Sequence, residues 1–274
     1  MKRYSGAAYT GLLISLVVLI STQPIRADSG PDHQAVQPRP IELGVSGGNI
    51  NDFAARRIGV VCCGGTLGGL VTNGSNFFIL SNNHVLAKVN TAVIGDDVVQ
   101  PGLLDTNCDP GDVVADLTDF EPISFSANNT IDAAIAEIRA GQVDTSGSIL
   151  DIDQPGSTPA TPTVGMAVKK SGRTTGLTRG EIKAINVTVR ISYPKGGVCG
   201  TRSKQTATFT NQVRITGTAG PFSAGGDSGS LVVEDVQSCP SPVGLLFAGS
   251  TTDTFANPIT DVLTTFGVTI AGCP

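Results

Sequence analysis

The most constraining feature of this sequence is a long succession of short apolar runs, each about as long as a strand. From Ile58 onward, runs rich in Val, Ile, Thr and Phe alternate with turn residues, as in "GTLGGLVTNGSNFFILSNNHVLA". The Asn73-Gly74 pair in this stretch is the strongest short signal for a β-hairpin. Only 15% of the residues are charged and 34 of 274 are Gly, which suits a protein with many tight turns. We therefore expect an all-β fold.

A segment rich in Pro, Ser and Thr, "DIDQPGSTPATPT", separates two sets of these runs. It predicts two packed β-barrels rather than one sandwich, with residues 55–150 in the first barrel, 151–163 in the connector and 164–274 in the second. Residues 132–144 suit a helix by composition, and a strand that ends in a loop equally well. Residues Ile259 to Phe266 are expected to form a short C-terminal helix.

The N-terminal residues 1–27 have the pattern of a secretory signal peptide. Lys2 and Arg3 precede a largely apolar run, and the segment closes at Ala27, where we expect cleavage. The alternative is a membrane anchor, but the run is shorter than the roughly 20 residues that a bilayer requires. We therefore expect a secreted or otherwise extracytoplasmic protein with no stable membrane span after processing. Residues 28–54 have little periodic hydrophobicity and predict an extended lead-in or pro-segment.

The cysteines and the net charge restrict the function classes. An even number of cysteines in an exported chain predicts at least two disulfides, with 15 pairings open, although reduced and buried cysteines are an alternative. No C-x-x-C pair exists, so we expect neither a metal site nor a cofactor. A net charge of −5 argues against a nucleic-acid partner. The cysteines are Cys62, Cys63, Cys108, Cys199, Cys239 and Cys273.

The stretch "FSAGGDSGSLVV" surrounds Ser228 with flexible backbone and then enters an apolar run. Glycines allow consecutive N–H groups to converge on one point, where they can stabilise an oxyanion by roughly 3–4 kcal/mol per donor. A serine nucleophile also needs a base, since its hydroxyl reacts poorly at neutral pH. The alternative is a Gly-rich hairpin, which favours the same residue types.

The chain has two histidines, and only His84 follows a predicted strand, because His33 falls in the lead-in. Taken alone, His84 also fits a structural histidine that caps a turn. Asp132 is the candidate third member, because an ionised side chain in the mostly apolar run "TIDAAIAEI" needs a partner. Glu137 in the same run has a longer side chain and is the alternative, which we expect to be solvated.

Together, "SNNHVLA", "IDAAIA", "GGDSGSLVV" and "VGLLFAGS" resemble the trypsin-like serine proteases of the chymotrypsin fold, and "KKSGRTTGLTRGEI" resembles the bacterial members. The resemblance implies two six-stranded antiparallel barrels with the site between them. His84 and Asp132 would come from the first barrel and Ser228 from the second, with the Gly226 and Ser228 N–H groups as oxyanion donors. The expected function is an exported serine endopeptidase that acts on proteins or peptides through an acyl-enzyme.

Two other functions are alternatives to this one. A catalytically weak binding or structural protein could have the same fold. An esterase or acyltransferase normally has G-x-S-x-G and the order Ser, Asp, His, which this chain lacks.

The resemblance also implies a specificity pocket and a departure from the animal enzymes. Phe222 would form the base of the pocket and residues 247–249 its wall, namely Phe247, Ala248 and Gly249. No carboxylate lies in "TAGPFSAGG", so we expect charged substrate side chains to be rejected and small or medium uncharged ones to be accepted. In the animal enzymes, cleavage exposes a new N-terminus whose amine pairs with the aspartate before the nucleophile. The segment "ARRIGVV" only partly matches such a cleavage site, so Asp227 is expected to have an internal partner.

Overall fold

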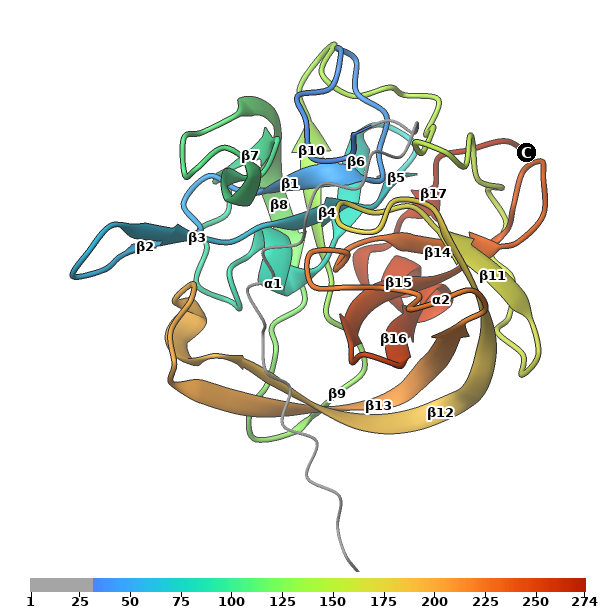
Figure 1. Ribbon diagram of the computed structural model, residues 1–274. Coiled ribbons are helices and arrows are strands. Elements are labelled where there is room, and N and C mark those ends of the chain that lie inside the picture. The colour runs from blue at the N-terminus through green and yellow to red at the C-terminus, as the bar shows by residue number, and fades with distance from the viewer. Residues whose placement is uncertain (1–31) are drawn as a thin grey trace, which may run out of the picture.

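The structure is a computed structural model that describes residues 32–274. The predicted signal peptide and the first residues of the lead-in lie outside the described residues. Two β-barrels lie side by side, and a short helix packs against the second one (Figure 1). In the described part of the chain, no helix is long and apolar enough to cross a membrane.

The first barrel closes through a strand that bends at Gly68. On one side of Gly68, β4 pairs with β1, and on the other side β5 pairs with β6, so the two short strands act as one and complete a six-stranded ring. The predicted hairpin at Asn73-Gly74 joins β5 to β6, and residues 132–144 contribute a strand rather than a helix. The ring contains β1 (Val45–Asn49), β4 (Gly65–Leu67), β5 (Gly69–Thr72), β6 (Phe77–Ser81), β7 (Asp97–Gln100), β8 (Asp112–Phe120) and β10 (Ala134–Ile138).

The second barrel also has six antiparallel strands, because β12 pairs with both β11 and β13 and so closes the sheet. The two six-stranded barrels that the resemblance implied are therefore confirmed. The predicted C-terminal helix is present as α2 (Ile259–Phe266), and β17 (Thr269–Ile270) then pairs with β5 of the first barrel. The strands are β11 (Ala167–Lys170), β12 (Thr178–Pro194), β13 (Lys204–Gly217), β14 (Leu231–Glu234), β15 (Pro242–Gly249) and β16 (Asp253–Pro258), with β9 (Asn128–Asn129) added parallel to β13.

The predicted lead-in is partly wrong, because its later residues belong to the first barrel. Strand β1 lies inside the larger sheet, and Ile41 is fully buried. The glycines that concealed this strand in the sequence are needed for close packing: a Cβ built on Gly47 would lie 2.4 Å from the Leu67 side chain. His33 is also buried, with ring nitrogens 3.0 Å from the Gly44 carbonyl oxygen and 2.9 Å from Asp151 Oδ2.

Three disulfides link the six cysteines, which confirms the prediction of at least two. The pairs are Cys62–Cys108, Cys63–Cys199 and Cys239–Cys273. The second of these joins the first barrel to the loop between β12 and β13. Such bonds form and persist in oxidising compartments, which supports an extracellular location.

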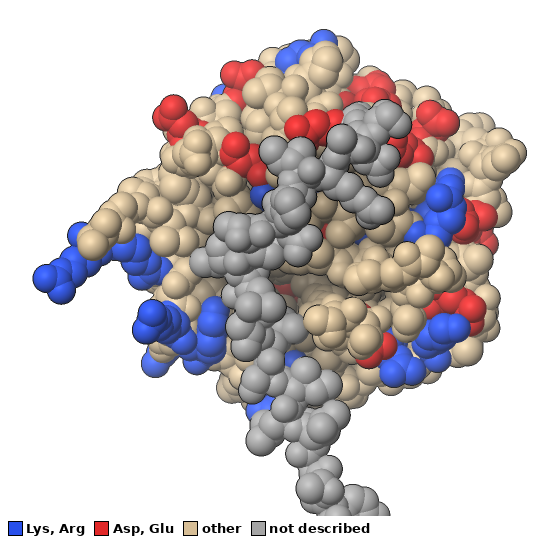
Figure 2. Space-filling model, viewed as in Figure 1, with Lys and Arg blue, Asp and Glu red and all other residues tan. Residues whose placement is uncertain are grey.

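A two-stranded hairpin projects from the first barrel beside this loop (Figure 1). It consists of β2 (Phe53–Ala55) and β3 (Val60–Cys62). Figure 2 shows basic side chains gathered over this hairpin and the neighbouring tip of β12–β13, whereas acidic side chains predominate along the upper edge of the same view. The charge of the protein is therefore unevenly distributed on this face.

Candidate active site

The sheet of the first barrel brings His84 and Asp132 together. Ser81, the last residue of β6, pairs with Ala134 at the start of β10. His84 follows Ser81 by three residues in the short helix α1 (Asn83–Leu86), and Asp132 precedes Ala134 by two. Because the strands are antiparallel, both side chains lie at the same end of the sheet.

Asp132 holds the imidazole of His84 in one orientation. His84 Nδ1 lies 2.6 Å from Asp132 Oδ2, and the backbone N–H of His84 donates to Asp132 Oδ1 at 3.2 Å. The Asp132 side chain is fully buried, whereas that of His84 is 22% exposed. A carboxylate accepts but does not donate, so Nδ1 carries the proton and Nε2 of the neutral ring keeps its lone pair.

Residues that the sequence did not reveal complete the surroundings of this carboxylate. The Tyr193 hydroxyl donates to Asp132 Oδ2 at 2.7 Å, and the Asp132 N–H donates to Asn257 Oδ1 at 3.1 Å. Burial, together with the nearby negative charge of Asp132, raises the pKa of Tyr193 well above its usual value, so the phenol remains a neutral donor. Both residues come from the second barrel, and no local motif marks them.

The loop that carries Ser228 lies against the end of β6 and against α1. The Ser228 carbonyl accepts from the Thr66 N–H at 2.8 Å. A Cβ built on Gly229 would lie 2.2 Å from Ser81 Oγ, so only glycine permits this approach. A Cβ built on Gly65 would meet both Val85 and the Ser228 carbonyl, which places Ser228 beside the residue that follows His84. Within residues 32–274, no hydrogen bond joins the side chains of Ser228 and His84.

The predicted oxyanion donors face no acceptor in the described part of the chain. Neither the Gly226 nor the Ser228 N–H donates a hydrogen bond there. Gly226 has φ +101°, a conformation that favours glycine, and its carbonyl accepts from Thr66 Oγ1 at 2.9 Å. Asp227 lies between the two donors, and its N–H donates to the Ala224 carbonyl at 3.1 Å. The turn therefore leaves both N–H groups available for a ligand.

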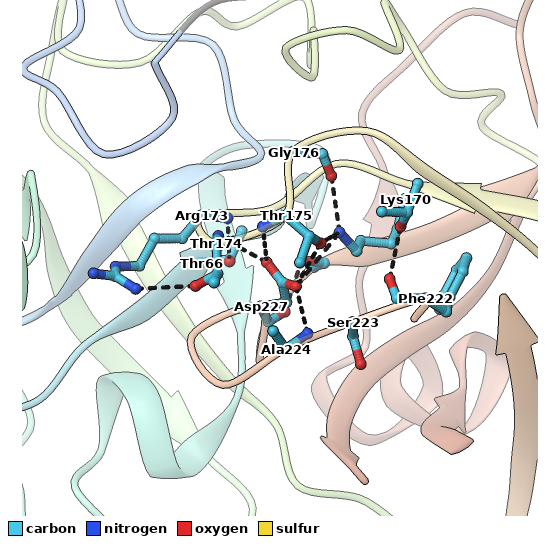
Figure 3. Close-up of polar contacts among 12 residues, drawn as sticks. Thr66, Lys170, Arg173, Thr174, Thr175, Gly176, Phe222, Ser223, Ala224 and Asp227 are labelled. Atoms are coloured by element: carbon cyan, nitrogen blue, oxygen red, sulfur yellow. Dashed lines mark hydrogen bonds and ion pairs between the residues drawn. The ribbon is translucent and has the colours of Figure 1, made fainter. Parts of the chain in front are cut away.

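The Asp227 side chain is fully buried and has an internal cationic partner (Figure 3). Lys170 Nζ lies 3.5 Å from Asp227 Oδ2, and Lys170 is fully buried as well. Asp227 Oδ1 accepts from the N–H groups of Thr174 and Thr175, and Oδ2 accepts from the Ala224 N–H and the Thr175 hydroxyl. The loop before Ser228 is thus fastened to the start of the second barrel.

The segment "ARRIGVV" does not take part in this arrangement. It spans the end of β2, the hairpin turn and most of β3, and Ile58 at the turn is 92% exposed. Asp227 instead pairs with Lys170. The described chain therefore shows the internal partner that we expected for Asp227.

Replacement of Lys170 by Met should destabilise the protein by about 3–5 kcal/mol and lower any activity, because Asp227 would keep a buried charge without its cation. Burial lowers the pKa of Lys170, and Asp227 opposes that change. Urea unfolding of Lys170→Met should show this loss, and the double variant Lys170→Met/Asp227→Asn should recover part of it. Wild-type stability of the single variant would rule out a structural role for the pair.

Three of the four predicted pocket residues are buried, in two different apolar clusters, and the fourth is half-buried. Phe222 is buried in the core of the second barrel, and Phe247 packs on Phe209 with ring centroids 4.9 Å apart. Ala248 is buried and Gly249 is half-buried on β15. A Cβ built on Gly249 would lie 3.1 Å from Ser223 Oγ, which hydrogen-bonds to Thr254 Oγ1 at 2.7 Å. The polar atoms beside this position are therefore the Ser223 hydroxyl and the Asp253 carbonyl oxygen, which would lie 3.2 Å from the same Cβ.

Asp52 is a second buried carboxyl group near His84. Burial raises its pKa to about 7, and the positive charge of Lys88, with that of His84 when the imidazole is protonated, only partly opposes this change. Its carboxylate lies within 4.8 Å of the sulfurs of Cys63 and Cys199. Those sulfurs are joined in a disulfide, so they are not available as thiolate ligands for a metal.

The variant Asp52→Asn should be more stable than the wild type at pH 8 and nearly equal to it at pH 4. The unfolded carboxyl ionises near pH 3.8 and the folded one near pH 7, so the native state binds the extra proton between these values and loses stability as the pH rises. Above pH 7, this pKa difference corresponds to a loss of at most about 4 kcal/mol from the free energy of unfolding of the wild type. Urea unfolding at several pH values measures it, and a constant difference between the proteins would contradict it.

The two barrels, with a His–Asp pair and a Gly-rich serine loop between them, define the class as the trypsin-like serine protease fold. One similar solved structure is a glutamic acid specific serine protease that utilizes a histidine triad in substrate binding. It has 25% identity and a TM-score of 0.56, with 84% of this chain and 100% of that chain covered. Another is protease A from Thermobifida fusca, with 21% identity, a TM-score of 0.50, and coverage of 82% of this chain and 98% of that chain.

The comparison with family models gives a more particular assignment. The Nal1 C-terminal domain matches residues 82–256, more than half of the sequence, and the chain belongs to this family. No curated protein matches the chain. The matched region includes His84, Asp132, Tyr193 and Ser228.

Proposed function

We propose that this protein is an exported serine endopeptidase that hydrolyses peptide bonds through an acyl-enzyme. The observation that carries the proposal is the 2.6 Å contact between His84 Nδ1 and buried Asp132, with the Ser228 loop seated against α1. Such contacts between base and nucleophile often tighten only when substrate is bound. The fold and its protease relatives support the same reading.

In the proposed reaction, Ser228 Oγ attacks the carbonyl carbon while its proton moves to Nε2 of His84. The N–H groups of Gly226 and Ser228 stabilise the oxyanion of the tetrahedral intermediate. The C–N bond then breaks, the leaving amine takes the proton from His84, and an acyl-Ser228 ester remains. Water then attacks the carbonyl carbon of this ester with His84 as the base, and the carboxylic acid product leaves Ser228. Asp132 and the hydroxyl of Tyr193 fix the imidazole and stabilise its charged form.

The alternative is a catalytically weak binding or structural protein of the same fold. An active-site-directed fluorophosphonate separates the two, because it phosphonylates only an activated serine. We expect mass spectrometry to find the label on Ser228 in the wild type and not in His84→Ala. A wild-type protein that remains unlabelled under conditions that label trypsin would remove the proposal.

We further propose that the pocket formed by Phe222, Phe247, Ala248 and Gly249 accepts small or medium uncharged side chains. A nearby polar group is the hydroxyl of buried Ser223, and an unpaired charge beside it would be costly. The chain has only two histidines, so it cannot reproduce the histidine triad of the glutamic acid specific relative.

A peptide series that varies only the residue before the scissile bond tests this specificity. We expect Ala, Val and Leu to be preferred, with steps of about 10- to 200-fold per methylene at most. Equal concentrations of Arg, Lys and Glu peptides serve as the charged set. A preference of about a hundredfold for any charged member would show the assignment of the pocket to be wrong.

Export is proposed on the basis of residues 1–27, with processing near Ala27. The three disulfides support it, since they require an oxidising compartment.

A further inference from the structure

A cluster of unpaired cations lies at one end of the molecule. Among residues 32–274, every Lys or Arg without an acidic partner within 4.0 Å belongs to this cluster, except Lys169. The members come from the β2–β3 hairpin, the residues after α1, and the tip of β12–β13. We call this cluster the basic tip, and it consists of Arg56, Arg57, Lys88, Arg190, Lys195, Arg202 and Lys204.

The sequence around the basic tip contains no compensating acids. There is no Asp or Glu between Glu181 and Asp227, and none between Asp52 and Asp96. These two stretches supply all of the members, although the net charge of the whole chain is −5. Figure 2 shows the resulting concentration of basic side chains, which contrasts with the mixed charges on the opposite side of the view. Like charges gathered with few counter-charges, of which the buried Asp52 carboxyl group near Lys88 is one, favour an anionic ligand.

The basic tip adjoins the candidate active site through two elements. Lys88 follows His84 by four residues and lies just beyond the end of α1 at Leu86. Lys195 follows Tyr193, whose hydroxyl contacts Asp132, by two residues. The parts of the tip also contact one another: a Cβ built on Gly197 would lie 2.1 Å from the Lys88 carbonyl oxygen. Short stretches of chain therefore connect the basic tip to the candidate base and to the tyrosine that contacts Asp132.

The tip lies on the leaving-group side of the site. In Figure 1, α1 stands between the β2–β3 hairpin on one side and strands β14 and β15 on the other. Residues 247–249 of β15 are the wall of the proposed pocket, which takes the residue before the scissile bond. His84 delivers its proton to the leaving amine, so the residues after the bond pass α1 on the opposite side. An extended peptide rises about 3.3 Å per residue, so its second to fourth residues after the bond extend roughly 7–13 Å beyond it, toward the tip.

We propose that the basic tip binds acidic side chains of the substrate on the C-terminal side of the scissile bond. This inference rests on the proposed endopeptidase function and names its substrate class: peptides with Asp or Glu in the second to fourth positions after the cleaved bond. Each exposed ion pair contributes little, but several cations act together on a run of carboxylates. The attraction is screened by salt, because the Debye length falls from about 8 Å at physiological ionic strength to about 3 Å at 1 M.

The cleavage test compares peptides that share one cleavable core. One has acidic residues after the bond, the second has Asn and Gln there, and the third has the acidic residues before the bond. We expect kcat/KM for the first to exceed that for the other two by about tenfold, mainly through KM, and to lose this advantage near 1 M salt. Equal values for the first two peptides would overturn the inference.

A set of variants localises the effect. Lys195, Arg202 and Lys204 are exposed, and within the described residues their side chains make no hydrogen bond, so Lys195→Gln/Arg202→Gln/Lys204→Gln should fold normally. The triple variant should cleave the acidic peptide as slowly as the neutral one. Its kcat/KM for the neutral peptide should equal that of the wild type. The matched control is Lys183→Gln, a cation of β12 that pairs with Glu181, and it should retain the preference. An unchanged preference in the triple variant would contradict the proposal.

A binding arm separates failure of this inference from failure of the proposed function. Full-length Ser228→Ala is titrated with the same peptides, each carrying a fluorescent label. Fluorescence anisotropy should show that the peptide with acidic residues after the bond binds more tightly than the other two. This difference should disappear when Lys195→Gln/Arg202→Gln/Lys204→Gln is added to Ser228→Ala. If the wild type cleaves no peptide but this binding difference is found, only the catalytic function fails. If binding is equal for all peptides, the inference fails. Tighter binding of a single-stranded oligonucleotide than of the acidic peptide would also overturn it, in favour of nucleic acid.

Discussion

Purified Ser228→Ala should show no measurable turnover of peptides that the wild type cleaves, a loss of about 10⁵- to 10⁶-fold in kcat. The nucleophile, the base and the orienting carboxylate act as a unit, so removal of the attacking oxygen ends the covalent route. The side chain is half-buried in a turn held by backbone contacts, and its hydroxyl supports no hydrogen bond within residues 32–274. The loss should therefore be chemical rather than structural.

Two controls accompany this experiment. Circular dichroism and the thermal midpoint of Ser228→Ala should match those of the wild type. His84→Ala should lose as much activity, and the double variant Ser228→Ala/His84→Ala should lose little more, because such effects are not additive. Peptide hydrolysis at near wild-type rates by Ser228→Ala would sink the assignment.

Asp132→Asn should lower kcat by about 10⁴-fold at neutral pH. The fully buried carboxylate accepts from His84 Nδ1 and from the Tyr193 hydroxyl, and an amide satisfies both donors less well and permits the wrong imidazole tautomer. A pH–rate profile measured with a good peptide substrate gives the size of the loss.

The matched control for Asp132→Asn is Glu137→Gln, which alters the other acid of the same run. Glu137 is exposed on β10, and its variant should keep full activity. If Glu137→Gln lost more activity than Asp132→Asn, the two carboxylates would have to exchange roles.

The features that the sequence predicted well have local causes. Asn73-Gly74 specifies a hairpin by its own turn geometry, and residues Ile259–Phe266 form a helix with the bounds expected. Both of these signals lie within about ten residues of the feature that they predict. Asp132 was chosen by a local argument as well, an ionisable group in an apolar run, but its partnership with His84, 48 residues earlier, came from the resemblance.

The features that were missed depend on contacts between distant parts of the chain. The sequence predicts a lead-in where strand β1 forms, because Gly47 and its neighbours resemble loop residues, and only the packing of Leu67 against them explains the glycine. Tyr193 and Asn257 approach Asp132 only because the second barrel docks on the first. The disulfide pairing was likewise open, since spacing alone does not show which cysteines meet.

The pairing of β17 with β5 has a consequence for folding during synthesis. Thr269 lies 197 residues after Thr72, its partner in the sheet, and the first barrel lacks this edge strand until residues 269–270 leave the ribosome. Strand pairs so distant in sequence form slowly, because a long loop must close first. Asp132 also lacks two of its hydrogen-bond partners until Tyr193 and Asn257 have been synthesised. A nascent chain therefore carries the candidate catalytic residues without their final geometry until residues through Asn257 have been translated.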